Sequence, residues 1–99
     1  MTEVLWASSA QTDREEIFAY LLHEAGFNVA AAADEKFINM AEVLRNNPLA
    51  GLQRGKKVHQ RKLVVPNFPF ILVYFVAANE VHILRILHTA RKIAATFQA

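Results

Sequence analysis

The chain contains no cysteine, only 3 glycines and 3 prolines, and no apolar run long enough to cross a membrane. Without cysteine it can form neither a disulfide framework nor a thiolate metal site, and this composition fits a reducing cytoplasm. The longest apolar run, residues 68–78, contains Pro69 and is about half of the roughly 20 residues that a membrane-spanning helix requires. Residues 1–4 lack the basic start of a signal peptide. We therefore expect a cytoplasmic protein that is stabilised by packing and uses no cofactor or metal ion.

The low content of glycine and proline also argues against a disordered or low-complexity chain. The sequence has 99 residues, of which 54% are hydrophobic. A chain of this length buries only about two-thirds of the surface that its unfolded form exposes, which is too little to divide between two cores. We therefore expect one domain over residues 1–99.

Acidic residues are scarce in the second half of the chain. Residues 1–50 hold three Lys/Arg against eight Asp/Glu, a net charge of −5, whereas residues 51–99 hold eight Lys/Arg against one glutamate, a net charge of +7. Such a division predicts either a basic surface suited to a polyanion or an acidic protein, or a solvated surface whose sign simply varies along the chain.

The chain begins with the patterns of a strand and a helix. Residues 4–7 form a short apolar run, which predicts a strand. Ser8 and Gln11 have the spacing of a capping box, and Gly26 supplies a left-handed stop. A first helix is therefore expected over residues 9–25.

A second helix is expected directly afterwards. Asn28 is placed to cap it, and an apolar stripe continues until Asn46-Asn47-Pro48 ends the periodicity. Two helices joined by so few residues lie antiparallel, so this half of the chain predicts a helical hairpin.

The second half predicts a loop and then three strands. Residues 49–55 contain two glycines and no periodicity, which is typical of a loop. Alternating or continuous apolar side chains then predict an antiparallel meander over residues 58–65, 68–77 and 81–88. Residues 89–97 have helical composition and either dock against the sheet or stay mobile. The expected fold is α+β in the order β-α-α-β-β-β-(α), with a helical hairpin packed on a small, mainly antiparallel sheet.

Basic side chains are concentrated where the meander begins. Within nine positions the chain holds six binding candidates, which are Arg54, Lys56, Lys57, His59, Arg61 and Lys62. Side chains two residues apart on a strand share a face, so Lys57, His59 and Arg61 are expected to form one row, with Lys62 pointing the other way. Such a row suits phosphate groups, and the alternative is a solvated strand end.

Aromatic side chains gather in the predicted middle strand of the meander. Phe68, Phe70, Tyr74 and Phe75 have the composition of a base-stacking platform, but a central strand explains most of them as core. Tyr74 is expected to expose its hydroxyl and is therefore a further binding candidate.

Two histidines lie on the predicted last strand. His82 and His88 are six residues apart, so we expect them to face the same side of the sheet at a separation of about 20 Å. That separation excludes a metal ion shared between them.

Five short motifs follow one another along the chain. They are Leu5-Trp6-x-x-x-Ala10-x-x-Asp13-x-x-x-Ile17-x-x-Tyr20-Leu21, Asn47-Pro48-x-x-Gly51, Arg61-x-Leu63-Val64-Val65, Phe70-Ile71-Leu72-Val73-Tyr74 and Val81-x-Ile83-x-x-Ile86-Leu87-His88-x-x-Arg91. None is specific alone, but their order and spacing resemble the ParE/RelE superfamily of toxins over residues 4–93. The first and last motifs look more like ParE than RelE.

The resemblance implies the toxin of a type II toxin–antitoxin pair. A ParE-like toxin would bind DNA gyrase and stall it without covalent chemistry, and a cognate antitoxin would wrap the toxin with an extended, acidic C-terminal segment. A RelE-like toxin would instead be a ribosome-dependent mRNA endonuclease, in which the 2′-hydroxyl attacks the adjacent phosphate. The third alternative is a non-toxic binding module of the same fold.

Residue 71 favours the ParE-like alternative. In many members of the superfamily an arginine stands at this place, inside a Tyr-Arg-x-x-Tyr-like strand, and it can contribute to the phosphate site of ribonuclease members. This chain has Ile71 there.

If the chain cleaves RNA, the resemblance implies that His88, Arg91 and Arg61 are catalytic. A histidine has an ordinary pKa near neutrality, which suits His88 to general acid or base work at the end of the last strand. Arg91 and Arg61, with Lys57, would neutralise charge that develops on the phosphate. The alternative is a structural His88 that hydrogen-bonds to backbone.

Overall fold

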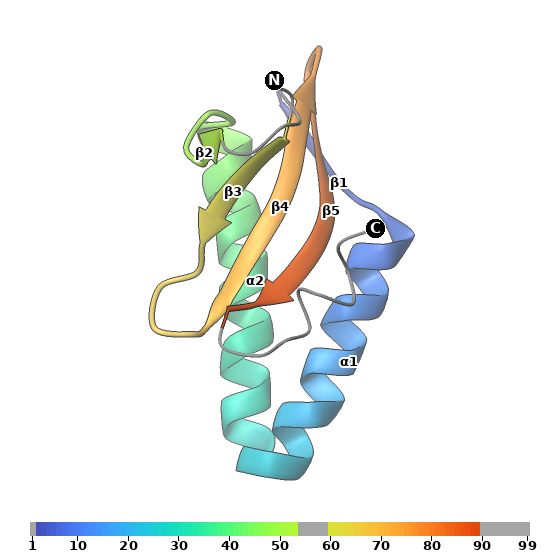
Figure 1. Ribbon diagram of the computed structural model, residues 1–99, viewed down its shortest axis with the longest axis vertical. Coiled ribbons are helices and arrows are strands. Elements are labelled where there is room, and N and C mark those ends of the chain that lie inside the picture. The colour runs from blue at the N-terminus through green and yellow to red at the C-terminus, as the bar shows by residue number, and fades with distance from the viewer. Residues whose placement is uncertain (1, 54–59, 90–99) are drawn as a thin grey trace.

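The structure, a computed structural model, describes residues 2–53 and 60–89. These residues form a five-stranded sheet with a helical hairpin against one face (Figure 1). In chain order the elements are β1 (Glu3–Trp6), α1 (Ser8–Ala25), α2 (Phe27–Asn46), β2 (Leu52–Gln53), β3 (Gln60–Val64), β4 (Phe70–Ala77) and β5 (Glu80–His88). The expected α+β fold is confirmed, including the hairpin of two helices and the mainly antiparallel sheet.

The strands lie in the order β1-β5-β4-β3-β2. β1 runs parallel to β5, and the other neighbouring pairs are antiparallel, so the predicted meander is confirmed. β2 falls inside residues 49–55, where only a loop was predicted, and that part of the prediction is wrong. Leu52 and Gln53 pair with Lys62 and Arg61, and a strand of two residues has no periodicity that a sequence can display.

β4 begins later than predicted because of Pro69. This residue has no N–H to donate to a neighbouring strand, and Asn67 before it adopts a positive φ of 69° in the connecting turn. Pairing resumes when the Phe70 carbonyl accepts a hydrogen bond from the Val65 N–H at 3.0 Å. The start of the predicted strand 58–65 and almost all of the expected final helix lie outside the described residues.

Both predicted helix caps are wrong. α1 starts at Ser8 itself after Ala7, and α2 starts at Phe27 after Gly26, with no side-chain cap hydrogen bond at either start. The Ala7 N–H donates to the Ile83 carbonyl at 2.9 Å, so the strand pairing continues to the residue before the helix. Gly26, at φ 94°, ends one helix and starts the next, because only glycine adopts such a conformation without strain.

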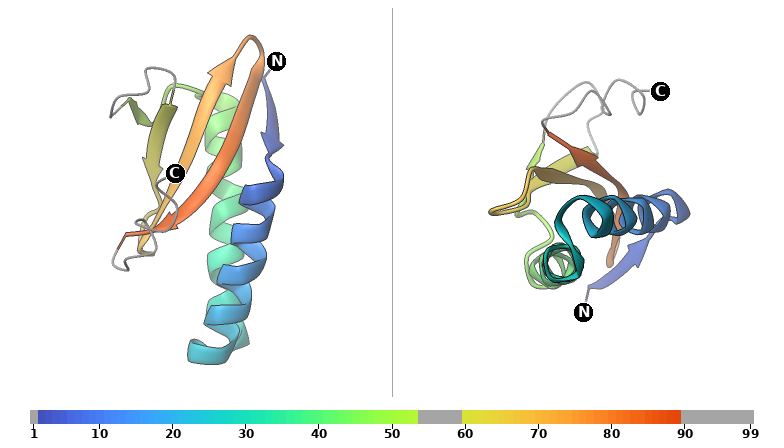
Figure 2. Two further views of the ribbon diagram at one scale, coloured as in Figure 1. Left: turned by 45° about the vertical axis from the view of Figure 1, so that its right-hand side comes forward. Right: turned by 90° about the horizontal axis from the view of Figure 1, so that it is seen from below.

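The core lies between the hairpin and the sheet. The two helices cover one face of the sheet, and no other described element covers the opposite face (Figure 2). We call this opposite face the open face. The buried core consists of Ala10, Phe37, Met40, Ala41, Leu44, Val65, Phe70, Leu72, Tyr74, Val81, Ile83 and Ile86.

A bulge in β5 decides which side chains reach the open face. Val73 pairs with Arg85 but the next residue, Tyr74, pairs with Ile83, so β5 carries one extra residue at this point. An extra residue reverses the alternation of side chains beyond it. Arg85 is therefore placed on the open face beside Val73.

The same bulge corrects the prediction for the two histidines. The His82 ring stacks on Phe75, with centroids 4.6 Å apart, on the open face. The His88 ring makes an edge contact with Phe70, a core residue, with centroids 5.0 Å apart. The expectation that both histidines face the same side is wrong, because the inserted residue separates them along the strand.

Neither helix of the described chain combines the length and the apolar character that a membrane span requires.

Candidate functional site

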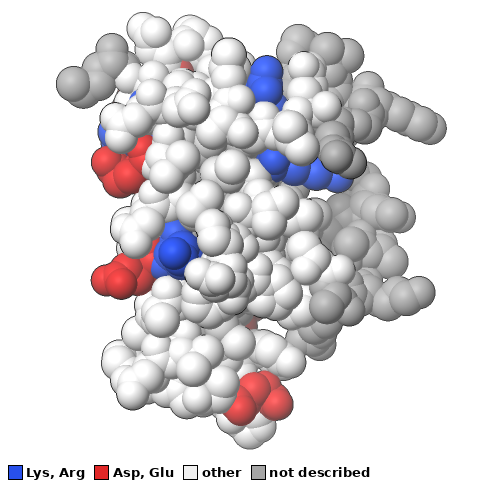
Figure 3. Space-filling model, turned by 90° about the vertical axis from the view of Figure 1, so that its left-hand side faces the viewer, with Lys and Arg blue, Asp and Glu red and all other residues white. Residues whose placement is uncertain are grey.

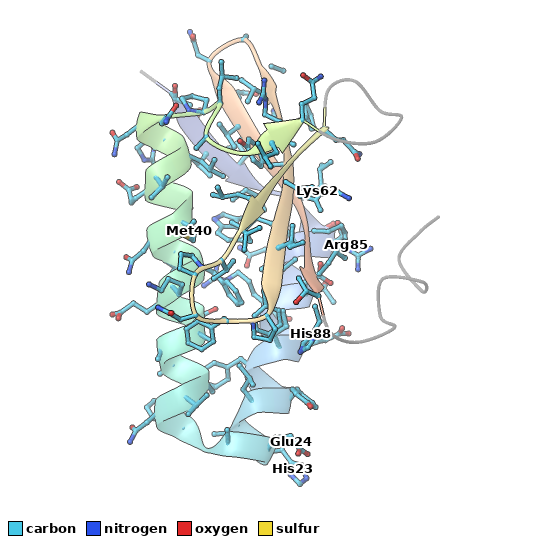
Figure 4. The ribbon with its side chains drawn as sticks, turned by 60° about the vertical axis from the view of Figure 1, so that its left-hand side comes forward. His23, Glu24, Met40, Lys62, Arg85 and His88 are labelled. Atoms are coloured by element: carbon cyan, nitrogen blue, oxygen red, sulfur yellow. The ribbon has the colours of Figure 1, made fainter. Side chains whose placement is uncertain are left out.

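Two basic side chains share one cross-strand row on the open face. Lys62 pairs with Val73, and Val73 pairs with Arg85. Since neighbouring strands are about 4.8 Å apart, the backbones of the two basic residues lie about 10 Å from each other. Figure 4 shows Lys62 and Arg85 on the side of the sheet opposite α2.

Apolar side chains flank this basic row on the open face. On one side of it lies a row made of Val64, Ile71 and Leu87, which are partners in register. On the other side lies the stacked pair of Phe75 and His82. The open face therefore combines apolar area with positive charge, which is the composition of a protein-binding surface for an acidic partner.

Arg85 is held in place by Asp13 of α1. Its Nε and Nη2 atoms donate to the two carboxylate oxygens of Asp13 at 2.8 and 3.0 Å, and the Ile86 N–H donates to the same carboxylate at 2.8 Å. Asp13 is only 4% exposed. Its hydrogen bonds raise the pKa of Arg85, although burial opposes this effect. The guanidinium is therefore charged and fixed in orientation.

This contact also closes an edge of the sheet. β1 pairs with β5 only as far as Ile83. Beyond this residue, the backbone groups on the same edge of β5 would otherwise lack hydrogen-bond partners. α1 supplies them, because Ser9 Oγ donates to the Leu84 carbonyl at 2.8 Å and Asp13 accepts from the Ile86 N–H. The early sequence motif thus serves the docking of α1 against the last strand.

Tyr74 lies in the core and not at the surface. Its side chain is 0% exposed, so the prediction of an exposed hydroxyl is wrong. The hydroxyl accepts from the Gly51 N–H and donates to the Pro48 carbonyl, both at 2.8 Å. Tyr74 stands on the helix-facing side of β4, where the loop after α2 passes over it and covers the ring.

Arg61 belongs to the same cluster. Its Nη1 atom donates to the Gly51 carbonyl at 2.9 Å, and its strand partner is Tyr74. We call Pro48, Gly51, Arg61 and Tyr74 the loop latch. Three of the sequence motifs meet in this latch, which fastens the loop after α2 to the sheet.

Because of Tyr74 in the loop latch, the stability of the fold is expected to fall at alkaline pH. Burial raises the pKa of Tyr74, and the Gly51 hydrogen bond and the Arg61 charge only partly offset this. Its pKa in the folded protein thus exceeds the unfolded value of about 10. The neutral hydroxyl therefore stabilises the fold fully below about pH 10, and this contribution is lost as the pH rises through the folded pKa.

We expect Tyr74→Phe to lower the free energy of unfolding by roughly 1–3 kcal/mol near neutral pH, because it leaves the buried Gly51 N–H without its acceptor. The loss of stability between pH 8 and about pH 11 should then be smaller in the variant than in the wild type. Urea unfolding at both pH values measures this. Tyr20→Phe, which changes an exposed tyrosine, is the control, and an equal alkaline loss in all three proteins would contradict the role given to Tyr74.

The residues named as catalytic for RNA cleavage are not brought together within the described chain. Arg61 pairs opposite Tyr74, whereas His88 pairs opposite Phe70, so about 13 Å of strand β4 separates their levels. β4 also lies between their strands. Arg91 lies outside the described residues.

Most of the predicted basic cluster also lies outside the described residues, namely Arg54, Lys56, Lys57 and His59. Of the remaining two, Lys62 is exposed on the open face and Arg61 is engaged in the loop latch. The opposite orientations expected for Arg61 and Lys62 are confirmed by their strand partners. Sequence reasoning did not single out Arg85 or its contact with Asp13.

Comparison with known proteins identifies relatives of this arrangement. The family described as "ParE toxin of type II toxin-antitoxin system, parDE" matches residues 4–93. Among solved structures, a chain of the chromosomal ParDE TA system from P. aeruginosa is 24% identical with a TM-score of 0.79, over 89% of this chain and 96% of that one. A YoeB/ParE toxin from Agrobacterium tumefaciens is 16% identical with a TM-score of 0.62, over 88% of this chain and 98% of that one. No curated protein matches the sequence.

Proposed function

Because this chain belongs to the ParE toxin family of type II toxin–antitoxin systems, we propose that it arrests growth by binding DNA gyrase and that a cognate antitoxin neutralises it. Binding alone is sufficient for such a toxin, and the proposal requires no catalytic residue. The proposal places the chain in the cytoplasm, and a chain without cysteine fits such a reducing compartment.

The apolar row around Ile71 favours DNA gyrase over RNA as the target. Val64, Ile71 and Leu87 form an apolar row on the open face, at the place where an arginine of ribonuclease relatives can contribute to the phosphate site. An apolar row offers no donor to a phosphate and no charge to stabilise a transition state. Arg61 gives no substitute there, because its guanidinium is bonded to the Gly51 carbonyl.

An antitoxin with an acidic, extended segment is complementary to the open face. Lys62 supplies positive charge there, Arg85 lies in the same row with its charge balanced by Asp13, and residues 51–99 as a whole carry a net charge of +7. The apolar rows beside the two cations supply area for burial. Charge of one sign speeds the encounter with an acidic partner, and apolar contacts slow its release.

Expression of the chain alone in a bacterial host is expected to arrest growth, with DNA breaks and induction of the SOS response while translation continues. Co-expression of the antitoxin encoded beside it should relieve the arrest and raise the yield, since a partner that binds only the folded toxin stabilises it. Pulse-labelling of protein synthesis after induction, with inspection of the chromosome, measures the outcome.

Two results would contradict the proposal. An immediate collapse of translation with cut mRNA and intact chromosomes would replace gyrase by the ribosome as the target. Normal growth at high expression would indicate that the chain is a non-toxic binding module of the same fold.

A further inference from the structure

The end of the helical hairpin extends beyond the sheet and carries exposed apolar side chains (Figure 1). Phe27, the first residue of α2, is 63% exposed, and Leu22 in the last turn of α1 is 45% exposed. Phe18 makes an edge contact with Phe27, with ring centroids 6.2 Å apart, and lies four residues before Leu22 on the same side of α1. We call Phe18, Leu22 and Phe27 the tip patch.

Acidic side chains border the tip patch. Glu15 lies three residues before Phe18 and is its neighbour on α1, and Glu35 lies eight residues after Phe27, about 12 Å further along α2. Both are exposed, and neither forms an ion pair with a described residue. In the lower third of the face that Figure 3 draws, the described surface is mostly white, with acidic colour and no Lys or Arg.

The three arginine–carboxylate ion pairs within residues 2–53 and 60–89 leave the hairpin acidic. Asp13 is paired with Arg85, Asp34 with Arg14 and Glu42 with Arg45. Glu15, Glu16, Glu24 and Glu35 then stand against Lys36 alone among the remaining formally charged side chains of the hairpin, residues 8–46. The hairpin is thus opposite in sign to the basic second half of the chain.

We propose that the tip patch is the surface that contacts the target, and that the target offers an apolar recess bordered by lysine and arginine side chains. This inference rests on the proposed function and adds the place and the chemistry of the target contact. An exposed aromatic residue beside an exposed leucine is the kind of anchor that dominates a protein interface. The acidic border selects a basic rim on the partner.

Charge assigns the two partners to different surfaces. A partner drawn to the basic open face is itself acidic and is repelled by Glu15, Glu35 and their neighbours on the hairpin. The acidic antitoxin is therefore complementary to the open face and not to the tip patch. A second copy of the chain is also a poor occupant, because it would bring the same acidic border against this one.

Binding of the purified full-length chain to purified DNA gyrase tests the inference. We expect Phe27→Ser to weaken binding at least tenfold, because it removes the most exposed aromatic anchor. Leu49→Ser is the matched control, since Leu49 is 61% exposed in the turn that follows the other end of α2, and it should change affinity less than twofold.

A charge-reversal variant tests the same surface without touching the hydrophobic packing. The double change Glu15→Lys and Glu35→Lys should weaken gyrase binding at low ionic strength by a larger factor than in about 0.5 M salt, where exposed charges are screened. If Phe27→Ser lowers the melting temperature enough to leave the protein unfolded, the charge-reversal variant alone tests whether the tip patch contacts gyrase. Binding to the antitoxin encoded beside the toxin should be unchanged in both variants.

Three results would overturn the inference, and they are distinguishable. If the Phe27→Ser and the charge-reversal proteins both bind gyrase with wild-type affinity, the tip patch does not contact gyrase, and the proposed function is unaffected. Loss of antitoxin binding in these variants would assign the patch to the antitoxin. Failure of the wild-type chain to bind gyrase would overturn the inference and the proposed function together.

Discussion

Replacement of Asp13 by alanine is expected to lower the free energy of unfolding by about 2–4 kcal/mol, because a buried backbone N–H loses its acceptor and a partly exposed arginine loses two charge-assisted hydrogen bonds. The carboxylate is 4% exposed and accepts two hydrogen bonds from Arg85 and one from the Ile86 N–H. Its removal takes two hydrogen bonds from the Arg85 guanidinium and one from the buried Ile86 N–H. A domain of this size has only about 5–15 kcal/mol of stability, so the loss is severe.

Urea unfolding of the wild type, Asp13→Ala and Asp13→Asn measures this effect. The asparagine keeps an oxygen for the Ile86 N–H but loses the charge that faces Arg85, so its destabilisation should be intermediate. Asp34→Ala is the control, because Asp34 also binds an arginine with two hydrogen bonds but its side chain is 28% exposed. We expect the control to cost about 1 kcal/mol or less. Equal effects of Asp13→Ala and Asp34→Ala would show that the Asp13 contact does not hold α1 against the sheet.

The position of Asp13 was visible in the sequence, but its partner was not. Asp13 lies between Ala10 and Ile17 at helical spacing, so it shares their buried side of α1. An acidic residue on an apolar stripe requires a cation or a hydrogen-bond donor inside the protein. Arg85 is the single charged residue within residues 81–88. Nothing in the sequence links two residues 72 positions apart, so the pair required the fold.

The order of elements could be predicted because each is long enough to display its period. α1 and α2 place apolar side chains at helical spacing, and β4 and β5 are largely apolar over eight and nine residues. Features of one or two residues could not be predicted. The bulge in β5 adds a single residue, and the hydrogen bond from the Ala7 N–H to the Ile83 carbonyl takes the place of a side-chain cap at the start of α1.

The candidate site was predicted less well, because its members come from different elements. Arg61 and Tyr74 were selected as binding residues by type, since arginine suits phosphates and tyrosine suits interfaces. Both side chains are instead bonded to the backbone of Gly51. The motif around Pro48 and Gly51 was recognised without a reason for its glycine, and the loop latch supplies that reason.

Gly51→Ala is expected to lower the free energy of unfolding by about 3 kcal/mol, the sum of steric overpacking and a disturbed buried hydrogen bond. A Cβ atom at this position would lie 2.7 Å from the Tyr74 hydroxyl, 2.8 Å from a carbon of the same ring and 2.9 Å from the Lys62 carbonyl. The ring is fixed in the core and the carbonyl belongs to β3. The loop must therefore move away from the sheet, and the bonds of Tyr74 and Arg61 to Gly51 lengthen or break.

A double-mutant cycle with Tyr74→Phe separates this account from a general strain of the loop. Tyr74→Phe removes the hydroxyl that meets both the new Cβ atom and the Gly51 N–H, so part of the cost of Gly51→Ala is already incurred in that background. We expect the double variant to be more stable than the sum of the single effects predicts, by roughly 1 kcal/mol or more. Urea unfolding of the four proteins at neutral pH gives the coupling energy, and a second cycle with Tyr20→Phe, far from the loop, should give none. Strict additivity in the Tyr74 cycle would mean that the glycine is required for a reason other than the close approach of this hydroxyl.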